Sequence, residues 1–274
     1  MDKLSDTQKR FLDEYSDSRL VRDWTLNSET GLVDISGDFN CRVIDTVRDF
    51  KGITFGKVSG DFKCHDSHLT SLEGAPIYVG GEFDCSDNKL TSLKGAPREV
   101  GGNFNCCANR LITLNGGPLR VLGDFDCSGN FLTSLKGAPR EVGGNFNCCA
   151  NRLITLKGGP LRVLGDFDCS DNKLTSLKGA PQDVGGDFNC WKNNLTSLEG
   201  SPKVIEYNFY CRRNKLTSLD GAPDKIGEDL YVDGNLIGMA DTIDIKWIIK
   251  KIVPENVYWL DYAKLVIKEI NKWN

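Results

Sequence analysis

The sequence lacks three features that indicate common functions. Lysine and arginine total 34 against 38 aspartates and glutamates, a net charge of −4, so the broad positive field of a nucleic-acid-binding protein is missing. No apolar run approaches the roughly 18 residues of a membrane span, and the first 15 residues contain no apolar signal region. We therefore expect a soluble, unexported, cytoplasmic protein that binds neither nucleic acid nor membranes directly.

Histidine is scarce as well, which argues against a catalytic or metal centre. His65 and His68 are the only two histidines. One falls at the end of an expected strand and the other in a turn, so we do not expect them to converge on a metal ion. The sequence has no Ser/His/Asp arrangement and no phosphate-binding glycine loop before a helix. It predicts no enzymatic activity, no metal and no cofactor.

What the chain contains instead is a repeat of 21 residues. Eight full units run from residue 60 to 227, a 23-residue variant begins at Gly37, and a fading unit begins at residue 228. Each unit reads G-[DN]-F-[DN]-C-x-x-N-x-L-T-S-L-x-G-[AG]-P-x-x-V-G. Residues 102–143 and 144–185 differ at only five of 42 positions, which indicates duplication of a two-repeat block. A fixed period of this length predicts a repeat solenoid.

The order of residues within a unit predicts the path of each coil. Phe and Cys alternate with polar residues, which is the period of a short strand that points both side chains inward. The Asn and the Leu two residues later turn the chain, and the Gly-Ala-Pro or Gly-Gly-Pro segment excludes a helix on the return path. Since one coil is too thin to bury its own apolar face, stacked coils should share one continuous core.

The F-x-C-x-x-N-x-L segment of residues 104–111 resembles the leucine-rich repeat consensus from its fourth position onward, and the overlay holds from residue 83 to 216. The sequence of the repeat is similar to that of uncharacterised bacteriophage and bacterial repeat proteins. This resemblance implies a right-handed superhelix with one parallel β-sheet, β/coil return paths and a curved scaffold for binding other proteins. The chain departs from the consensus where Gly replaces its first Leu, at 101, 143 and 185, which predicts a bulge before the strand.

The two ends of the chain are expected to cap the solenoid. Residues 1–36 should form an N-terminal cap, with a short helix over 6–15 followed by short strands. The solenoid itself should occupy 37–240 in about ten coils. Residues 241–274 have apolar side chains at helical spacing on both sides of Pro254, which predicts a helical C-terminal cap. A helix lying on a membrane surface is the alternative for this basic tail.

Two columns of residues recur inside the coils. We expect each buried asparagine amide to satisfy backbone groups of its turn rather than to bind a ligand. This structural column comprises Asn88, Asn109, Asn130, Asn151, Asn172, Asn193, Asn214 and Asn235. Nine cysteines at the second inward strand position should be free and buried, because neighbouring side chains in a parallel ladder do not point toward each other. Cys107 and Cys149 should face solvent, and thiols in this arrangement favour a reducing cytosol.

The outward side of the same strands is acidic. The residue before each Phe and the residue between Phe and Cys give 20 positions, with ten acids and a single base. In the middle coils, acids and amides alternate from one coil to the next. This face is either a solvated surface that prevents aggregation or a cradle for a basic protein surface. The candidate binding residues on it are Asp84, Asp124, Asp126, Asp166, Asp168 and Asp187.

The repeats near the C-terminus break their own consensus. Trp191, Tyr210, Arg212 and Tyr231 replace small polar residues on adjacent strands and should form one exposed patch. Trp, Tyr and Arg are the residue types that dominate the energetics of protein interfaces. Drift of the terminal repeats toward their cap is the alternative explanation.

These patterns predict a non-enzymatic scaffold for protein–protein interactions, whose partner binds the acidic face or the aromatic patch. The phage resemblance implies a host or virion protein as that partner. Two alternatives stay open: a nucleic-acid mimic that blocks a DNA-binding protein, and a carbohydrate-binding adhesin that uses the aromatic patch. The sequence leaves the oligomeric state undetermined.

Overall fold

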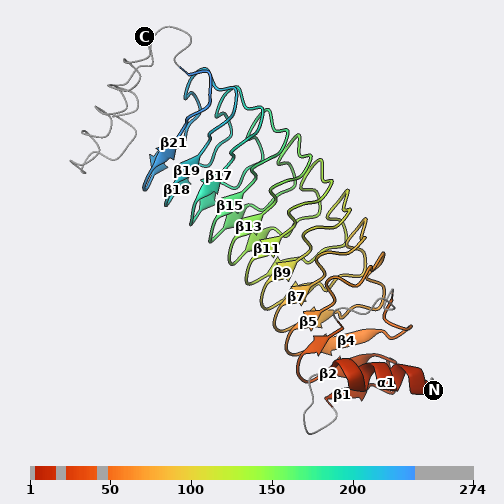
Figure 1. Cartoon of the computed structure of the whole chain (residues 1–274). Coiled ribbons are helices and arrows are strands. Elements are labelled where there is room, and N and C mark those ends of the chain that lie inside the picture. Colours follow the sequence, from red (N-terminus) through yellow and green to blue (C-terminus); the bar gives the residue numbers. More distant parts are fainter. Residues whose placement is uncertain (1–3, 17–22, 42–48, 238–274) are drawn as a thin grey trace.

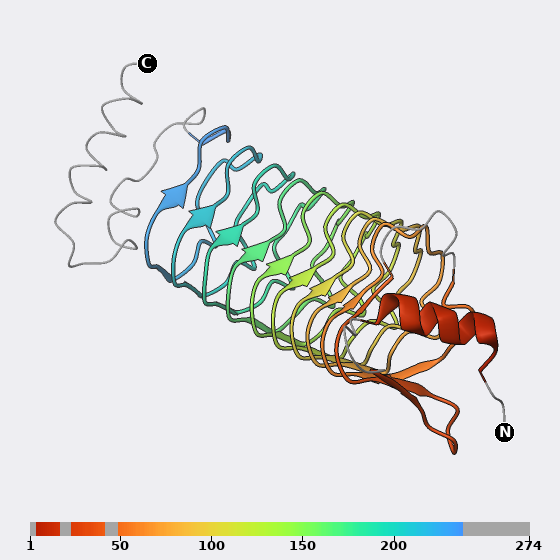
Figure 2. The same ribbon diagram turned by 60° about the horizontal axis from the view of Figure 1, so that its bottom comes forward.

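The chain winds into a stack of coils with helix α1 at its N-terminal end (Figure 1). The computed structural model describes residues 4–16, 23–41 and 49–237. Helix α1 (Asp6–Tyr15) matches the helix expected over 6–15. It begins with a capping box, in which Ser5 and Gln8 exchange side-chain and backbone hydrogen bonds, because this pair satisfies otherwise free N–H groups. Its Phe11 ring lies 5.7 Å from Phe39, so α1 covers the first coil, as Figure 2 also shows.

One parallel sheet, here called the phenylalanine sheet, contains the predicted Phe-x-Cys strands. In every pair of neighbouring strands the equivalent residues of successive coils are in register, so Phe125 lies between Phe104 and Phe146. Its ten strands are β3 (Phe39–Asn40), β5 (Phe62–Lys63), β7 (Phe83–Asp84), β9 (Phe104–Asn105), β11 (Phe125–Asp126), β13 (Phe146–Asn147), β15 (Phe167–Asp168), β17 (Phe188–Asn189), β19 (Phe209–Tyr210) and β21 (Leu230–Tyr231). The predicted parallel solenoid is therefore confirmed.

A second sheet, here called the valine sheet, follows the return path. The sequence predicted one sheet, and the difference arises because the residue pair ending in Val is also extended and pairs with its equivalents in the neighbouring coils. Its eleven strands are β1 (Trp24–Leu26), β2 (Val33–Ile35), β4 (Phe55–Val58), β6 (Tyr78–Val79), β8 (Glu99–Val100), β10 (Arg120–Val121), β12 (Glu141–Val142), β14 (Arg162–Val163), β16 (Asp183–Val184), β18 (Val204–Ile205) and β20 (Lys225–Ile226). Only β1 is antiparallel to its neighbour, β2.

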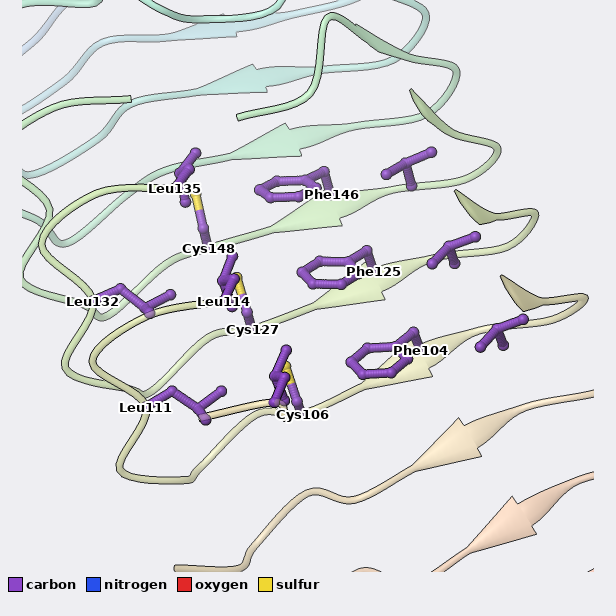
Figure 3. Close-up of a cluster of buried hydrophobic side chains, with 14 of the residues drawn as sticks. Phe104, Cys106, Leu111, Leu114, Phe125, Cys127, Leu132, Leu135, Phe146 and Cys148 are labelled. Atoms are coloured by element: carbon purple, nitrogen blue, oxygen red, sulfur yellow. The ribbon is translucent and has the colours of Figure 1, made fainter. Parts of the chain in front are cut away.

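The core consists of identical side chains stacked along the solenoid (Figure 3). From Phe62 to Phe188, consecutive phenyl rings have centroids 5.2–5.6 Å apart and are within 18° of parallel. This spacing slightly exceeds the roughly 4.8 Å between parallel strands, so the rings stack with an offset. Cys, Leu and Val columns fill the remaining interior. Regular stacking therefore follows directly from the repeat period.

The cysteines are free, as the sequence predicted. The nine at the inward position are buried, and Cys107 and Cys149, expected to face solvent, are half-buried. Burial raises the pKa of the Cys107 and Cys149 thiols to about 11, and the pKa of the fully buried thiols lies further above its usual value. These thiols behave as small apolar groups.

Coils run as far as residue 237 in the described chain, and the solenoid boundaries of 37–240 stay a prediction. The helical cap expected over 241–274, with its membrane-surface alternative, lies outside the described residues. No helix in the described part of the chain has the length and apolar character needed to traverse a bilayer.

Candidate functional site

The outward residues that precede each Phe form a hydrogen-bonded ladder. The side-chain Oδ1 of Asp124 accepts the backbone N–H of Asn145 in the next coil at 2.7 Å. Asn145 accepts from Asp166, and Asp166 from Asp187, also at 2.7 Å. Equivalent bonds link other coils between Asp38 and Asp229. Three of the predicted binding residues, Asp124, Asp166 and Asp187, thus each use one oxygen to hold successive coils together.

A glycine precedes each ladder residue as far as Asp187, whereas Tyr207 and Glu228 precede Asn208 and Asp229. A Cβ atom built on Gly144 would lie 2.1 Å from the Oδ1 of Asp124, and one on Gly165 would lie 2.2 Å from the Oδ1 of Asn145. Any side chain at these positions would collide with the oxygen that makes the bond. In these middle coils the close approach of two coils therefore accounts for the glycine, and no ligand is needed to explain it.

The outward residues between Phe and Cys end each strand with a turn. The Oδ1 of Asp126 accepts the N–H of Ser128 at 2.8 Å, and that of Asn147 accepts the N–H of Cys149 at 3.1 Å. The Nδ2 of Asn147 also donates to the second oxygen of Asp126 at 3.1 Å, and Asn189 donates in the same way to Asp168. The alternation of acids and amides thus pairs each of these two carboxylates with an amide donor in the next coil.

The acidic face is hollowed toward its C-terminal end. A shallow cavity of about 250 Å³ lies over β13 to β19. Its polar lining comprises Asn145, Asn147, Asp166, Asp168, Asp187, Asn189 and Tyr210. Three predicted acids therefore meet a predicted aromatic residue here, whereas Asp84, Asp124 and Asp126 do not line the cavity. Asp84 instead lies 3.0 Å from the Nδ1 of His65.

The residues of the predicted aromatic patch lie beside this cavity, and all four are half-buried, whereas an exposed patch was expected. The rings of Tyr210 and Tyr231 stack with centroids 4.7 Å apart and an angle of 3°. The guanidinium of Arg212 lies 4.5 Å from the centre of the Tyr231 ring and forms an ion pair with Asp233. The Tyr231 hydroxyl donates to Asp229 at 2.9 Å, and this hydrogen bond raises the pKa of Tyr231 to about 12. Three of the four predicted patch residues thus form one cluster.

Trp191 extends this cluster by one coil, together with two cations that the sequence analysis did not include among its site residues. The Arg213 guanidinium and the Lys192 ammonium each lie 5.6 Å from the centre of the Trp191 ring. Lys192 also forms an ion pair with Asp171 at 2.9 Å. In the sequence, Lys192 and Arg213 could have been recognised because other coils carry Asp, Ala or Gly at this position. The backbone there has a positive φ, 55° at Lys192 and 48° at Arg213.

The asparagine column satisfies backbone groups in each turn. The Nδ2 of Asn130 donates to the carbonyls of Cys106 at 3.0 Å and Cys127 at 3.1 Å, and its Oδ1 accepts the N–H of Leu111 at 2.9 Å. The same pattern recurs from Asn88 to Asn235, with the side chains turned into the coil. These amides are used within the fold. Within the described residues, His, Cys, Asp and Glu form no group arranged to hold a metal ion.

The period, the in-register strands and the inward Leu columns together define a leucine-rich-repeat-like solenoid. No family model matches the chain, and no curated protein matches it either. The chain is similar to the solved structure of YopM from Yersinia enterocolitica WA-314, with 17% sequence identity and a TM-score of 0.34. The similarity covers 74% of this chain and 56% of YopM, so this chain spans little more than half the length of that protein.

Proposed function

We propose that the protein is a non-enzymatic protein–protein interaction scaffold whose partner binds the C-terminal patch, defined as Trp191, Tyr210, Arg212 and Tyr231, and the adjoining cavity. Solenoids of stacked repeats typically provide extended surfaces for binding other proteins. The patch combines the three residue types that most often carry binding energy at interfaces.

The observation that carries this proposal is the loss of a fold-stabilising hydrogen bond where the patch begins. In the six coils before it, from Asp84 to Asn189, an Asp or Asn at the position of Tyr210 accepts the N–H of the residue two places later, as Asn189 does for Trp191 at 3.0 Å. The outward-stacked ring of Tyr210 provides no equivalent acceptor for Arg212. A net contribution of about 0.5–1.5 kcal/mol per bond is given up here for a half-buried aromatic surface. Stacking of coils alone does not require that exchange.

The charges around the patch indicate the chemistry of its partner. Asp166, Asp168 and Asp187 make the cavity negative. The aromatic rings contact three cations, of which Arg212 and Lys192 are paired with aspartates, so charges of both signs lie around the patch. A complementary surface would insert a lysine or arginine into the cavity and place acidic or aromatic side chains over the patch. We therefore favour a protein with a mixed-charge surface over a uniformly basic one.

The charge density of the acidic face does not favour mimicry of nucleic acid. Duplex DNA carries one negative charge per roughly 1.7 Å of its axis. In the middle coils of this protein, acids alternate with amides across strands about 4.8 Å apart. The carboxylates are also partly engaged in hydrogen bonds, as Asp126 and Asp168 are with neighbouring amides.

A consensus-restoring variant tests the proposed function. Affinity capture from the native cell with mass spectrometry would first identify the partner. The variant combines Trp191→Ser, Tyr210→Asn, Arg212→Ser and Tyr231→Asp, which gives these coils the residue types that the middle repeats have at the same positions. We expect it to remain folded and to bind the partner at least about 30-fold more weakly.

The matched control is Asp84→Asn with Asp126→Asn, which removes charge from the acidic face away from the patch. This control should bind the partner as the wild type does. Undiminished capture by the consensus-restoring variant, or binding to a glycan array in place of any protein, would refute the proposal.

A further inference from the structure

The outward face of the valine sheet carries charges that alternate in sign from coil to coil. Glu99, Arg120, Glu141 and Arg162 occupy equivalent positions on β8, β10, β12 and β14, and all four are exposed. Their strands are in parallel register, with Arg120 beside Glu99 and Glu141 beside Arg162. None of the four forms an ion pair or a side-chain hydrogen bond within the described part of the chain. Their charges are therefore free to meet a complementary surface.

Exposed leucines alternate with glycines in the next outward column. Leu122 is 52% exposed and Leu164 is 53% exposed, while Gly101 and Gly143 occupy the coils between and beside them. A Cβ atom on Gly143 would lie 2.0 Å from the carbonyl oxygen of Leu122, so the gap between the two leucines is enforced by the backbone. Along this column, a protruding leucine in one coil thus alternates with a gap at a glycine in the next. Exposed apolar groups gathered on one face mark an interaction surface.

We propose that this valine-sheet face binds a second copy of the chain, with the two solenoids antiparallel about a two-fold axis that lies in the face between β10 and β12. Such an axis, perpendicular to the stack, makes each column face its own copy in reversed coil order. Glu99 then lies opposite Arg162 of the second copy, and Arg120 lies opposite Glu141. All four positions meet the opposite charge, which is the self-complementarity that a two-fold interface requires.

The same axis makes the leucine column self-complementary in shape. Leu122 faces the gap at Gly143 of the second copy, and Leu164 faces the gap at Gly101. In the adjoining exposed column, Leu119 faces the aliphatic stem of Arg140, which can cover it while its charge stays in water. The duplicated two-coil block generates both patterns, because it alternates each column with the same period.

The register of the dimer is selected by charge. Moving the axis one coil toward the C-terminus would place Arg98 opposite Lys203 of the second copy. Moving it one coil toward the N-terminus would place Lys57 opposite Arg162. Only the axis between β10 and β12, among these three, brings no like charges together along the exposed columns of these strands. Since the contact covers only a few coils, we expect a weak dimer that forms as concentration rises.

Charge reversal in two complementary variants tests this proposal on the full chain. The acidic variant combines Arg120→Glu with Arg162→Glu, and the basic variant combines Glu99→Arg with Glu141→Arg. Sedimentation velocity should show a concentration-dependent dimer for the wild type, weakened by high salt. Each variant alone should be monomeric, and an equimolar mixture of the two should form a heterodimer. Recovery in the mixture cannot arise from a folding defect, so it isolates the interface.

A matched pair of variants tests the protruding leucines. Leu122→Ser with Leu164→Ser should weaken the dimer at least tenfold. The control is Ile112→Ser with Ile154→Ser, which changes side chains that are 65% and 62% exposed, more than those of the two leucines. They lie in the turns after the phenylalanine sheet, so the control should leave the dimer intact. A wild type that stays monomeric at every concentration, or a dimer that survives both charge reversals, would overturn the proposal. Neither result bears on partner binding at the C-terminal patch, which lies on the other sheet.

Discussion

The middle coils and the last two described coils follow the same path, but the last coil carries Leu230 and Val232 where the others carry Phe and Cys. The two regions also differ at the surface and in the regularity of the core. Phenyl rings from Phe62 to Phe188 stack nearly parallel, whereas Phe209 meets Phe188 at 70° and a half-exposed leucine, Leu230, takes the next ring position. The surface changes at the same place, where Tyr210 and Tyr231 replace the hydrogen-bonded Asp or Asn. In the middle coils the outward residues are therefore constrained by the hydrogen bonds of the fold, and near the C-terminal end this constraint is absent.

The largest expected effect tests what both regions share, the dry thiol column. Burial raises the pKa of all eleven cysteines in the described chain, to about 12 for Cys41 and Cys211 and well above the usual value for the fully buried thiols. The unfolded chain releases these protons near pH 9 and the folded chain retains them, so the free energy of unfolding falls as pH rises above that value. Each thiol contributes a slope of about 1.4 kcal/mol per pH unit.

Urea unfolding followed by circular dichroism between about pH 8 and about pH 10 would measure this loss. The control variant replaces Cys106, Cys127 and Cys148 by alanine. Its slope above pH 9 should be shallower by about 4 kcal/mol per pH unit, whatever its stability at neutral pH. An unchanged slope would mean that these thiols are hydrated.

The second test compares the two regions of the phenyl stack. Phe125→Ala should lower the free energy of unfolding by about 3–5 kcal/mol, because it removes a fully buried ring between two neighbours. The equivalent change at the other end, Leu230→Ala, should lower it by only about 1 kcal/mol, because that side chain is half-exposed. Chemical denaturation of both variants measures the difference. Equal losses would contradict the contrast between middle and end.

The third test uses the asparagine column. Asn130→Ala should cost about 1–3 kcal/mol, because it leaves the carbonyls of Cys106 and Cys127 and the N–H of Leu111 without partners in a buried turn. Asn235→Ala in the last coil should cost less, since that side chain is only half-buried and water can replace it. The measurement is the shift of the thermal midpoint in each variant. An unchanged midpoint for Asn130→Ala would reject the structural assignment.

The smallest expected effect concerns the alternation of acids and amides in the middle coils. Asn147→Asp removes the donor to Asp126 and places two carboxylates on adjacent strands, which should cost about 0.5–1 kcal/mol at low ionic strength. High salt should recover most of this loss. The control, Asp126→Asn, keeps a turn-closing oxygen and should show little salt dependence. A loss that is identical at both salt concentrations would argue against the charge explanation.

The inward half of each coil could be predicted from the sequence because its signal is local. Phe and Cys at a spacing of two, followed by Asn and Leu, specify one strand and one turn, and the 21-residue period repeats them. The same reasoning placed Tyr210, Arg212 and Tyr231 on adjacent strands, where the structure brings them into contact.

Features that depend on contacts between coils were not predictable in the same way. The valine sheet consists largely of two-residue strands such as Glu99–Val100, which are too short to show the alternation of inward and outward residues that identifies a strand in a sequence. The ladder from Asp124 to Asn145 joins residues 21 apart and depends on the absence of a side chain at Gly144. The acids could be recognised as a column, but their engagement with backbone N–H groups could be seen only once the coil-to-coil spacing was known.

The attachment of each coil to its neighbours alone has a mechanical consequence. If the described coils are pulled apart, a coil at the end of the stack can peel away without disturbing the coils behind it, because each repeat strand among the described residues pairs only with strands of the adjacent coils. Each detachment would release 21 residues, or about 70 Å of extended chain. Under tension the length of the protein would therefore increase in nearly equal steps, and each step would break the same few bonds between two coils.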